Sequence, residues 1–201
     1  MSRPVLHTDR LTLRPFTLAD APQVQRLVSA YEVALNTLTI PHPYPEGGAV
    51  EWISRHDEDY EQDRIVHFAI EASGEVVGAI GLILKGDGVG ELGYWVGVPY
   101  WGRGYVSEAA RAVLQYGFEE RKLRRIFACY LTRNPASGRV MEKIGMTYEG
   151  TMRRHVTKWD EHCDMAFYGM LREEWLSAQS SSAQSFSAQS INERTAGKTA
   201  D

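Results

Sequence analysis

The feature that most constrains this chain is the segment Glu91–Leu114, which reads ELGYWVGVPYWGRGYVSEAARAVL. A strand over Glu91–Val98 is expected to run through a short turn into a helix that begins at Tyr105. The turn contains Gly102 and Gly104. Glycines let main-chain N–H groups curl inward, and a helix N-terminus adds partial positive charge. The segment therefore predicts a site for an anion such as a pyrophosphate.

Two familiar phosphate-binding motifs do not account for this turn. A Walker P-loop needs Gly-x4-Gly-Lys-Ser/Thr, and the chain contains no such run. A Rossmann fingerprint needs a third glycine, and Ser107 stands at that position. A Gly-x-Gly pair after a strand is by itself more often a tight turn than a phosphate site. The order of the surrounding elements therefore has to distinguish between these two readings.

Strands and helices alternate along most of the chain, which predicts one α/β domain. We expect a mixed sheet of six or seven strands and about four helices. Thr17–Asp20 (TLAD) matches a capping box and marks the start of the first helix, which carries apolar residues as far as Tyr31. The long Pro-rich segment Asn36–Gly48 is expected to be a functional loop. The other expected helices are Ala49–Glu61 (with Val50, Ile53 and Tyr60 inward), Tyr105–Glu120 and Asn134–Ile144; the expected strands are Arg10–Phe16, Ile65–Glu71, Glu75–Leu84, Glu91–Val98, Arg125–Thr132, Thr147–Lys158 and Cys163–Leu171.

Charge and cysteine content exclude several classes of protein. Lys and Arg number 22 against 26 Asp and Glu, a net charge of −4, which disfavours a basic nucleic-acid groove. No apolar stretch is long enough to span a membrane and no secretory signal is visible, so a cytoplasmic location is expected. Cys129 and Cys163 are the only cysteines and are far apart, so neither a disulfide framework nor a zinc site is expected. We expect no metal.

The chain divides into a folded domain, residues 1–176, and a tail, residues 177–201. The tail contains the repeat SAQS three times and only two bulky apolar residues, Phe186 and Ile191. Such a composition cannot bury enough surface to offset the entropy of ordering, so a flexible tail is expected. Composition leaves open whether it binds a partner or is extraneous to the natural protein.

Taken in order, five blocks of the domain resemble the GNAT acetyltransferases, in particular their RimJ/RimL-like branch. The resemblance runs from about Thr8 to Trp175. The blocks are TDRLTLRPFTLAD, IPHPYPEGGAVEWI, ELGYWVGVPYWGRGYVSEA, NPASGRVMEKIGM, and YEGTMRRHV followed by Asp164 and Tyr168. The resemblance implies a sheet that splays open between Glu91–Val98 and Arg125–Thr132, with acetyl-CoA in the V-shaped gap.

The resemblance also implies which residues hold acetyl-CoA. The pantetheine arm would pair with the main chain near Val96–Val98 like an added strand, and the pyrophosphate would take N–H groups from the glycine turn. Asn134 would contact the pantetheine arm, although an Asn before a Pro also commonly caps a helix. One departure is Pro99, which replaces the Gln or Arg of the general GNAT signature. The implied residues are Val96, Gly97, Val98, Trp101, Gly102, Arg103, Gly104, Tyr105, Val106, Asn134 and Ser137.

Acetyl transfer to an amine needs a proton acceptor for the amine and a proton donor for the departing thiolate. Glu91 is the candidate base, because Glu91, Gly93 and Trp95 share one strand face and the glycine leaves room for a ligand. Many GNAT enzymes have an acidic Tyr seven residues after the Asn, where this chain has Met141. The resemblance points instead to Ser137 as the donor. A solvated strand-end charge and a first-turn helix serine are the plain alternatives.

The acceptor amine is the least determined part. The resemblance implies the N-terminal amine of a protein or peptide, with Asn36–Tyr44 and the turn Lys158–His162 bordering the acceptor side. The alternatives are a small-molecule amine, such as an amino sugar, an aminoglycoside or a polyamine, and a non-catalytic acyl-CoA-binding module. An oligomer remains open.

Overall fold

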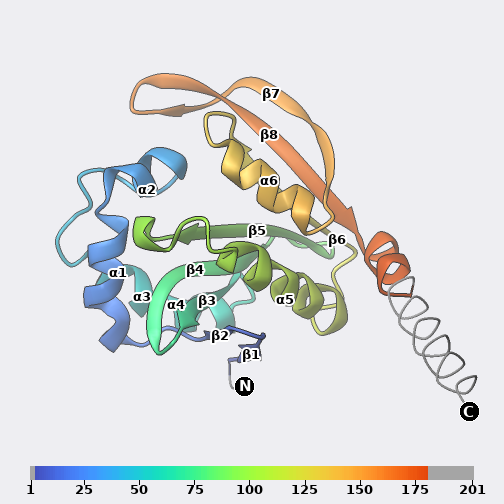
Figure 1. The fold of residues 1–201 in the computed structure, drawn as a ribbon, viewed down its shortest axis with the longest axis horizontal. Helices are drawn as coiled ribbons and strands as arrows, with labels where there is room; N and C mark the ends of the chain where they lie inside the picture. The colour runs from blue at the N-terminus through green and yellow to red at the C-terminus, as the bar shows by residue number, and fades with distance from the viewer. Residues whose placement is uncertain (1–2, 181–201) are drawn as a thin grey trace, which may run out of the picture.

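In the computed structural model, which describes residues 3–180, one mixed sheet of eight strands organises the chain (Figure 1). The strand order is β1-β2-β3-β4-β5-β6-β8-β7, and all neighbours are antiparallel except β5 and β6. The strands are β1 Leu6–His7, β2 Leu11–Arg14, β3 Ile65–Ala72, β4 Glu75–Leu84, β5 Val89–Val96, β6 Arg125–Leu131, β7 Thr147–Lys158 and β8 Glu161–Leu171.

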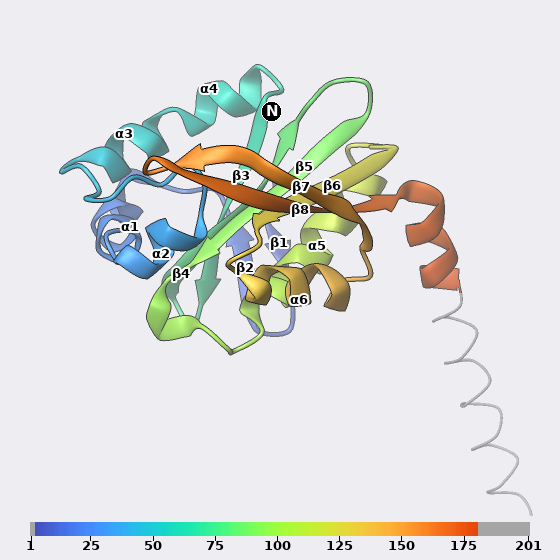
Figure 2. The same ribbon diagram turned by 90° about the horizontal axis from the view of Figure 1, so that it is seen from above.

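Helices cover both faces of the sheet. The α-helices are α1 Ala21–Val28, α2 Tyr31–Asn36, α3 Gly48–Ser54, α4 His56–Glu61, α5 Tyr105–Glu119 and α6 Pro135–Lys143; Leu18–Asp20 and Val98–Tyr100 form 3₁₀ turns. Figure 2 shows α3 and α4 on one side of the strands, with α5 and α6 on the other. This arrangement confirms the expected α/β class, with more elements than the expected six or seven strands and four helices.

Alternation along β3 and β4 explains the two-sided core. Phe68 and Ile70 pack in the cluster that includes Val113 of α5. Ala69, between them in sequence, packs in the cluster that includes Val24 of α1. Because both faces of these central strands are covered, their sequences are apolar almost throughout.

Several local expectations were wrong in detail. The expected helix Ala49–Glu61 is interrupted at Arg55, whose N–H donates to the Trp52 carbonyl three residues back, a tighter turn than an α-helix makes. Val50 is 49% exposed, and Ala49 is buried in its place. The strand expected to reach Val98 ends at Val96, and a 3₁₀ turn follows. The capping box at Thr17–Asp20 is confirmed.

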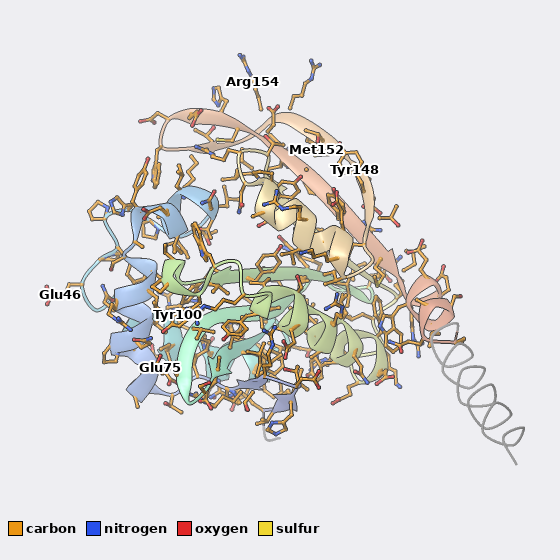
Figure 3. All side chains as sticks on the ribbon, viewed as in Figure 1. Glu46, Glu75, Tyr100, Tyr148, Met152 and Arg154 are labelled. Atoms are coloured by element: carbon orange, nitrogen blue, oxygen red, sulfur yellow. The ribbon has the colours of Figure 1, made fainter. Side chains whose placement is uncertain are left out.

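The C-terminal hairpin β7–β8 arches over α6 (Figure 1). Its supports are polar: Asp164 Oδ1 accepts the Arg154 N–H at 2.7 Å, and Tyr168 donates to Glu142 at 3.1 Å. The labelled side chain of Arg154 points away from the molecule in Figure 3. Tyr148 packs on Tyr168, with 5.3 Å between ring centres, so the face of the hairpin that carries these two rings is the one that covers α6.

Residues 172–180 continue as a helix after β8. The expected tail, residues 177–201, therefore begins inside this helix, and residues 181–201 lie outside the described residues. Within residues 3–180, no helix is both long enough and apolar enough to cross a membrane.

Candidate active site

The site begins where β5 and β6 separate. These parallel strands pair over only three positions, Val89 with Arg125, Gly90 with Ile126 and Glu91 with Phe127. Beyond Glu91, β5 continues beside β4 to Val96, whereas β6 continues beside β8 to Leu131. The expected splay is therefore confirmed: the sheet opens between Leu92–Val96 and 128–131.

The glycine turn has the main-chain geometry that the sequence predicts. Gly102 and Gly104 have φ of +74° and +79°, a left-handed conformation that side chains rarely adopt. A Cβ at Gly102 would meet nothing within 4 Å, so the turn is open on that side. Gly104 is the N-cap of α5, whose fifteen residues direct their first N–H groups toward the turn. The turn and helix end fit a pyrophosphate.

A cavity of about 320 Å³, which we call the α5 cavity, lies against this turn. Among its lining residues, Arg139 and Lys143 of α6 add positive charge for phosphate groups. The expected cofactor residues that line it are Val96, Trp101, Gly102, Gly104, Tyr105, Val106, Asn134 and Ser137.

The other three expected cofactor residues do not line the α5 cavity. Gly97 donates its N–H to the Val77 carbonyl at 2.9 Å and faces Leu27, whose Cδ2 lies 2.6 Å from the Cβ position. Val98 begins the 3₁₀ turn. The Arg103 guanidinium donates to the Pro99 carbonyl and lies 5.6 Å from the Tyr100 ring centre. Tyr100 anchors the 3₁₀ turn Val98–Tyr100 as well, because its hydroxyl donates to the Glu75 carboxylate at 3.1 Å. Both residues are labelled in Figure 3.

Sequence reasoning missed the role of the Trp101 side chain. Its indole N–H donates to the Val96 carbonyl at 2.7 Å, where a pantetheine amide is expected to pair. An added strand would have to share or replace this bond. The indole also ties the glycine turn to the end of β5.

Asn134 and Ser137 form one hydrogen-bonded unit at the start of α6. The Asn134 side-chain amide donates to Ser137 Oγ at 2.9 Å, and the Ser137 N–H donates to the Asn134 carbonyl at 3.1 Å. Because Ser137 Oγ already accepts a hydrogen bond, its own proton is available for a different acceptor. The Tyr94 hydroxyl donates to the Ser137 carbonyl at 3.3 Å, and burial raises the pKa of Tyr94. Tyr94 thus holds α6 across the gap as a neutral phenol.

A larger cavity of about 640 Å³, the α3 cavity, lies on the opposite side of the sheet. Its lining includes Glu91, Gly93 and Trp95, the three residues expected to share one face of the strand. The expected acceptor loop also lines it, at 36–41 and Tyr44. Tyr94, Trp95 and Ser137 line both cavities, as do Asn36 and Thr37 at the end of α2. The two cavities therefore meet at the opening between β5 and β6.

Glu91 lies at the base of this opening. Its Oε2 atom pairs with Lys85 Nζ at 2.6 Å, and the Cys129 thiol is 3.7 Å from Oε1. Burial, together with the charge of Glu91, raises the pKa of Cys129 to about 12. The cysteine is therefore a neutral neighbour of the Glu91–Lys85 pair.

The tip of the β7–β8 hairpin contacts the loop that lines the α3 cavity. Lys158 Nζ donates to the carbonyls of Leu38 and Ile40, at 3.2 and 3.1 Å. Trp159 stacks on Tyr31 with 5.5 Å between ring centres. The loop Asn36–Tyr44 and the turn Lys158–His162, which were both expected to border the acceptor side, therefore contact each other directly.

Comparison with known proteins identifies the family to which the chain belongs. A family model described as an acetyltransferase (GNAT) domain matches residues 10–147. The chain belongs to the GNAT acetyltransferase family. YnaD of Bacillus subtilis (strain 168), an uncharacterised N-acetyltransferase, is 43% identical over 90 residues, which are 45% of this chain and 53% of YnaD. YoaA of the same strain, also an uncharacterised N-acetyltransferase, is 30% identical over 173 residues, 84% of this chain and 97% of YoaA. The chain thus spans about half of one GNAT relative and nearly all of the other.

Solved structures agree. A GNAT acetyltransferase from Bacillus anthracis superposes with a TM-score of 0.77 at 30% identity, covering 85% of this chain and 100% of that one. RimL, a ribosomal L7/L12 alpha-N-protein acetyltransferase solved with coenzyme A, shares the fold with a TM-score of 0.78 at 16% identity, covering 85% and 99%. YdaF of Bacillus subtilis (strain 168), provisionally named a ribosomal N-acetyltransferase, is 35% identical over 85 residues, 42% of this chain and 46% of YdaF. The GNAT family is thereby confirmed, and the likeness to RimL is a likeness of fold.

Proposed function

We propose that this GNAT protein transfers the acetyl group of acetyl-CoA directly to a primary amine, and that the amine is the N-terminus of a peptide or protein. The observation that carries the proposal is the meeting of two cavities at Tyr94, Trp95 and Ser137. A cosubstrate in the α5 cavity and an amine in the α3 cavity would approach each other from opposite faces of the sheet. Such an approach brings the two reactants together without a covalent enzyme intermediate.

The α5 cavity suits coenzyme A for reasons of main-chain shape and charge. The N–H groups at the start of α5 would hold the pyrophosphate, and Arg139 and Lys143 would lie near other phosphate oxygens. Asn134 and Ser137 would contact the pantetheine end. When bound, acetyl-CoA supplies the acetyl group as an activated thioester.

Ser137 is the proposed proton donor to the departing sulfur. Since Asn134 donates to Ser137 Oγ, the hydroxyl proton is free to point toward a thiolate. An unperturbed hydroxyl is a weak acid, so hydrogen bonding to the sulfur is the larger part of this role. Met141, at the position where many GNAT enzymes have a tyrosine, is 1% exposed and belongs to the core.

Glu91 is the proposed proton acceptor for the amine. It lines the α3 cavity on the face shared with Gly93, and its carboxylate pairs with Lys85. An ammonium group has no lone pair, so a carboxylate that removes its proton, directly or through water, makes the nitrogen nucleophilic.

The choice of a peptide N-terminus rests on relatives. RimL acts on a protein N-terminus, as its description states, and YdaF is named for ribosomal acetylation. A small-molecule amine is the competing acceptor.

The test is release of coenzyme A thiol from acetyl-CoA in the presence of an acceptor panel. The panel contains short peptides, polyamines, amino sugars and aminoglycosides, and mass spectrometry locates the acetyl group. We expect release with peptides that have a free N-terminus and none with the same peptides acetylated beforehand. Release with small amines alone would contradict the peptide assignment.

A further inference from the structure

The α3 cavity has a wall of apolar side chains that the core leaves partly uncovered. Ile40, Tyr44, Trp52 and Trp95 pack against the buried cluster under α1 and α3, yet each is only partly buried. All four line the α3 cavity, as do the half-buried Ile65 and Ile83. Covering such surface with another apolar group is favourable by the hydrophobic effect. The wall therefore suits an apolar ligand.

The ionisable side chains on the same lining already have partners. Glu91 pairs with Lys85, and Glu51 pairs with Arg55 one helical turn away. The His67 ring stacks on His56 at 3.9 Å and lies 3.5 Å from Asp59. Because each charge on the lining has its counter-charge within the protein, a polycation or a phosphorylated acceptor would give up hydration without gaining a free ionic partner.

The floor of the cavity is bare beside the opening. Gly81 and Gly93 are paired neighbours on β4 and β5, and His67 of β3 continues the same row. A Cβ added at Gly93 would meet nothing within 4 Å. This gap lies one strand position from Tyr94, which lines both cavities. A substituent on the carbon that carries the reacting amine therefore has room beside the apolar wall.

We propose that the acceptor of this enzyme is an amine carried on a bulky apolar group, which packs on the Trp52, Ile65 and Trp95 wall above Gly93. In a peptide this is an N-terminal Phe, Leu or Met rather than Gly, Ala or Ser. A small arylalkylamine has the same chemistry, and the test separates the two sources. This inference rests on the proposed function and specifies its acceptor.

The first experiment compares peptides that differ only at the N-terminal residue, at saturating acetyl-CoA. We expect kcat/KM for Phe and Leu peptides to exceed that for Ala and Ser peptides by about tenfold or more. Phenethylamine and ethylamine are run beside them, and a peptide acceptor predicts that phenethylamine is slower than the Phe peptide. Equal or higher kcat/KM for the Ala and Ser peptides would overturn the inference while leaving acetyl transfer intact.

Binding is measured separately, by calorimetry of the Phe and Ser peptides in the presence of coenzyme A. Tighter binding of the Phe peptide by about tenfold or more supports the apolar pocket. If no acetylation follows, the proposed function fails, and what stands is the preference of this pocket for an apolar group. Equal binding of the two peptides overturns the inference.

The variant Gly93→Val tests the location of the pocket. Its φ lies outside the left-handed region and valine suits a strand, so the fold should accept it. We expect kcat/KM to fall at least tenfold for the Phe peptide and by a clearly smaller factor for the Ala peptide. An unchanged Kd for coenzyme A and an unchanged Tm serve as the controls for folding, and Gly93→Ala should give an intermediate loss. Equal losses for the two peptides would place the apolar group elsewhere and overturn the inference.

Discussion

At the scale of single residues, the site depends on main-chain groups as much as on side chains. Gly102 and Gly104 matter because their φ values are positive, and Trp101 matters because its indole holds the Val96 carbonyl. Asn134 acts on Ser137 rather than alone. Two predictions belong to this scale.

Gly104→Val should weaken coenzyme A binding at least tenfold, about 1.4 kcal/mol or more. The reason is backbone strain: φ at Gly104 is +79°, and a β-branched residue would pull the first N–H groups of α5 out of position. The Kd is measured by calorimetry. The matched control is Gly86→Val, because Gly86 has φ of +81°, meets nothing within 4 Å and does not line the α5 cavity. Equal effects of the two variants would show that the loss reflects general strain and not the anion site.

Ser137→Ala should lower kcat about ten- to a hundredfold while the Kd for coenzyme A changes little, because the hydroxyl is needed only as the sulfur leaves. The measurement is kcat from steady-state kinetics with an acceptor that the unmodified enzyme acetylates. Ser54→Ala is the control, since Ser54 is exposed on α3 and lines neither cavity. A Ser137→Ala enzyme with normal kcat would remove Ser137 from the mechanism.

At the scale of elements, the loop that lines the α3 cavity is held by a contact between distant segments. The β7–β8 hairpin tip reaches the loop between α2 and α3, and Lys158 donates to the carbonyls of Leu38 and Ile40. Lys158 is 5% exposed, and its burial lowers its pKa. A buried ammonium that satisfies two carbonyls is costly to remove, because those carbonyls would lose their partner.

Lys158→Met should reduce the free energy of unfolding by about 1–3 kcal/mol, measured by denaturant titration. The Kd for coenzyme A should not change, because the α5 cavity does not include this contact. Lys122→Met, at an exposed lysine, should change stability by no more than about 0.5 kcal/mol. If Lys158→Met and Lys122→Met were equally stable, the hydrogen bonds of Lys158 to the Leu38 and Ile40 carbonyls would contribute nothing to stability.

At the scale of the whole molecule, the most unusual feature is a histidine in the core. His56 is 1% exposed, and neither ring nitrogen has a hydrogen-bond partner within residues 3–180. Phe16 and Trp52 surround it, and His67 stacks on it. Burial, with the charges of His67 and Arg3, lowers its pKa from 6.5 to about 3.

This burial predicts a loss of stability in mild acid. Below about pH 6.5 the unfolded chain binds a proton at His56, whereas the folded chain does not until about pH 3. Stability should therefore fall by up to about 1.4 kcal/mol per pH unit in that window, about 2 kcal/mol between pH 7 and pH 5. His67, whose pKa burial also lowers despite Asp59, acts in the same direction.

The measurement is the free energy of unfolding at pH 7 and pH 5, for the natural chain and for His56→Phe. The phenylalanine variant should lose most of the His56 contribution and show a smaller difference between the two pH values. The same pH dependence in both proteins would show that other groups cause it.

The sequence alone determined the order of the longer strands and helices and the glycine turn, because local patterns specify strands, caps and turns. It did not predict the short elements β1 and α2. β4 and β7 have the expected bounds, and the Thr17–Asp20 capping box forms. The resemblance also pointed to Asn134 and Ser137, which are hydrogen-bonded to each other, and to Glu91, which lines a cavity together with Ser137.

Only the tertiary structure decided what surrounds these residues. Four contacts join residues from different turns or elements: Lys85 with Glu91, Trp101 with the Val96 carbonyl, His56 with its aromatic neighbours, and Lys158 with the Leu38 carbonyl. The two cavities likewise exist only because β5 and β6 part after three paired positions. Local sequence patterns indicate propensity and periodicity. A cavity wall or a contact between distant segments depends instead on the distances between elements, and the packing of the whole sheet determines those distances.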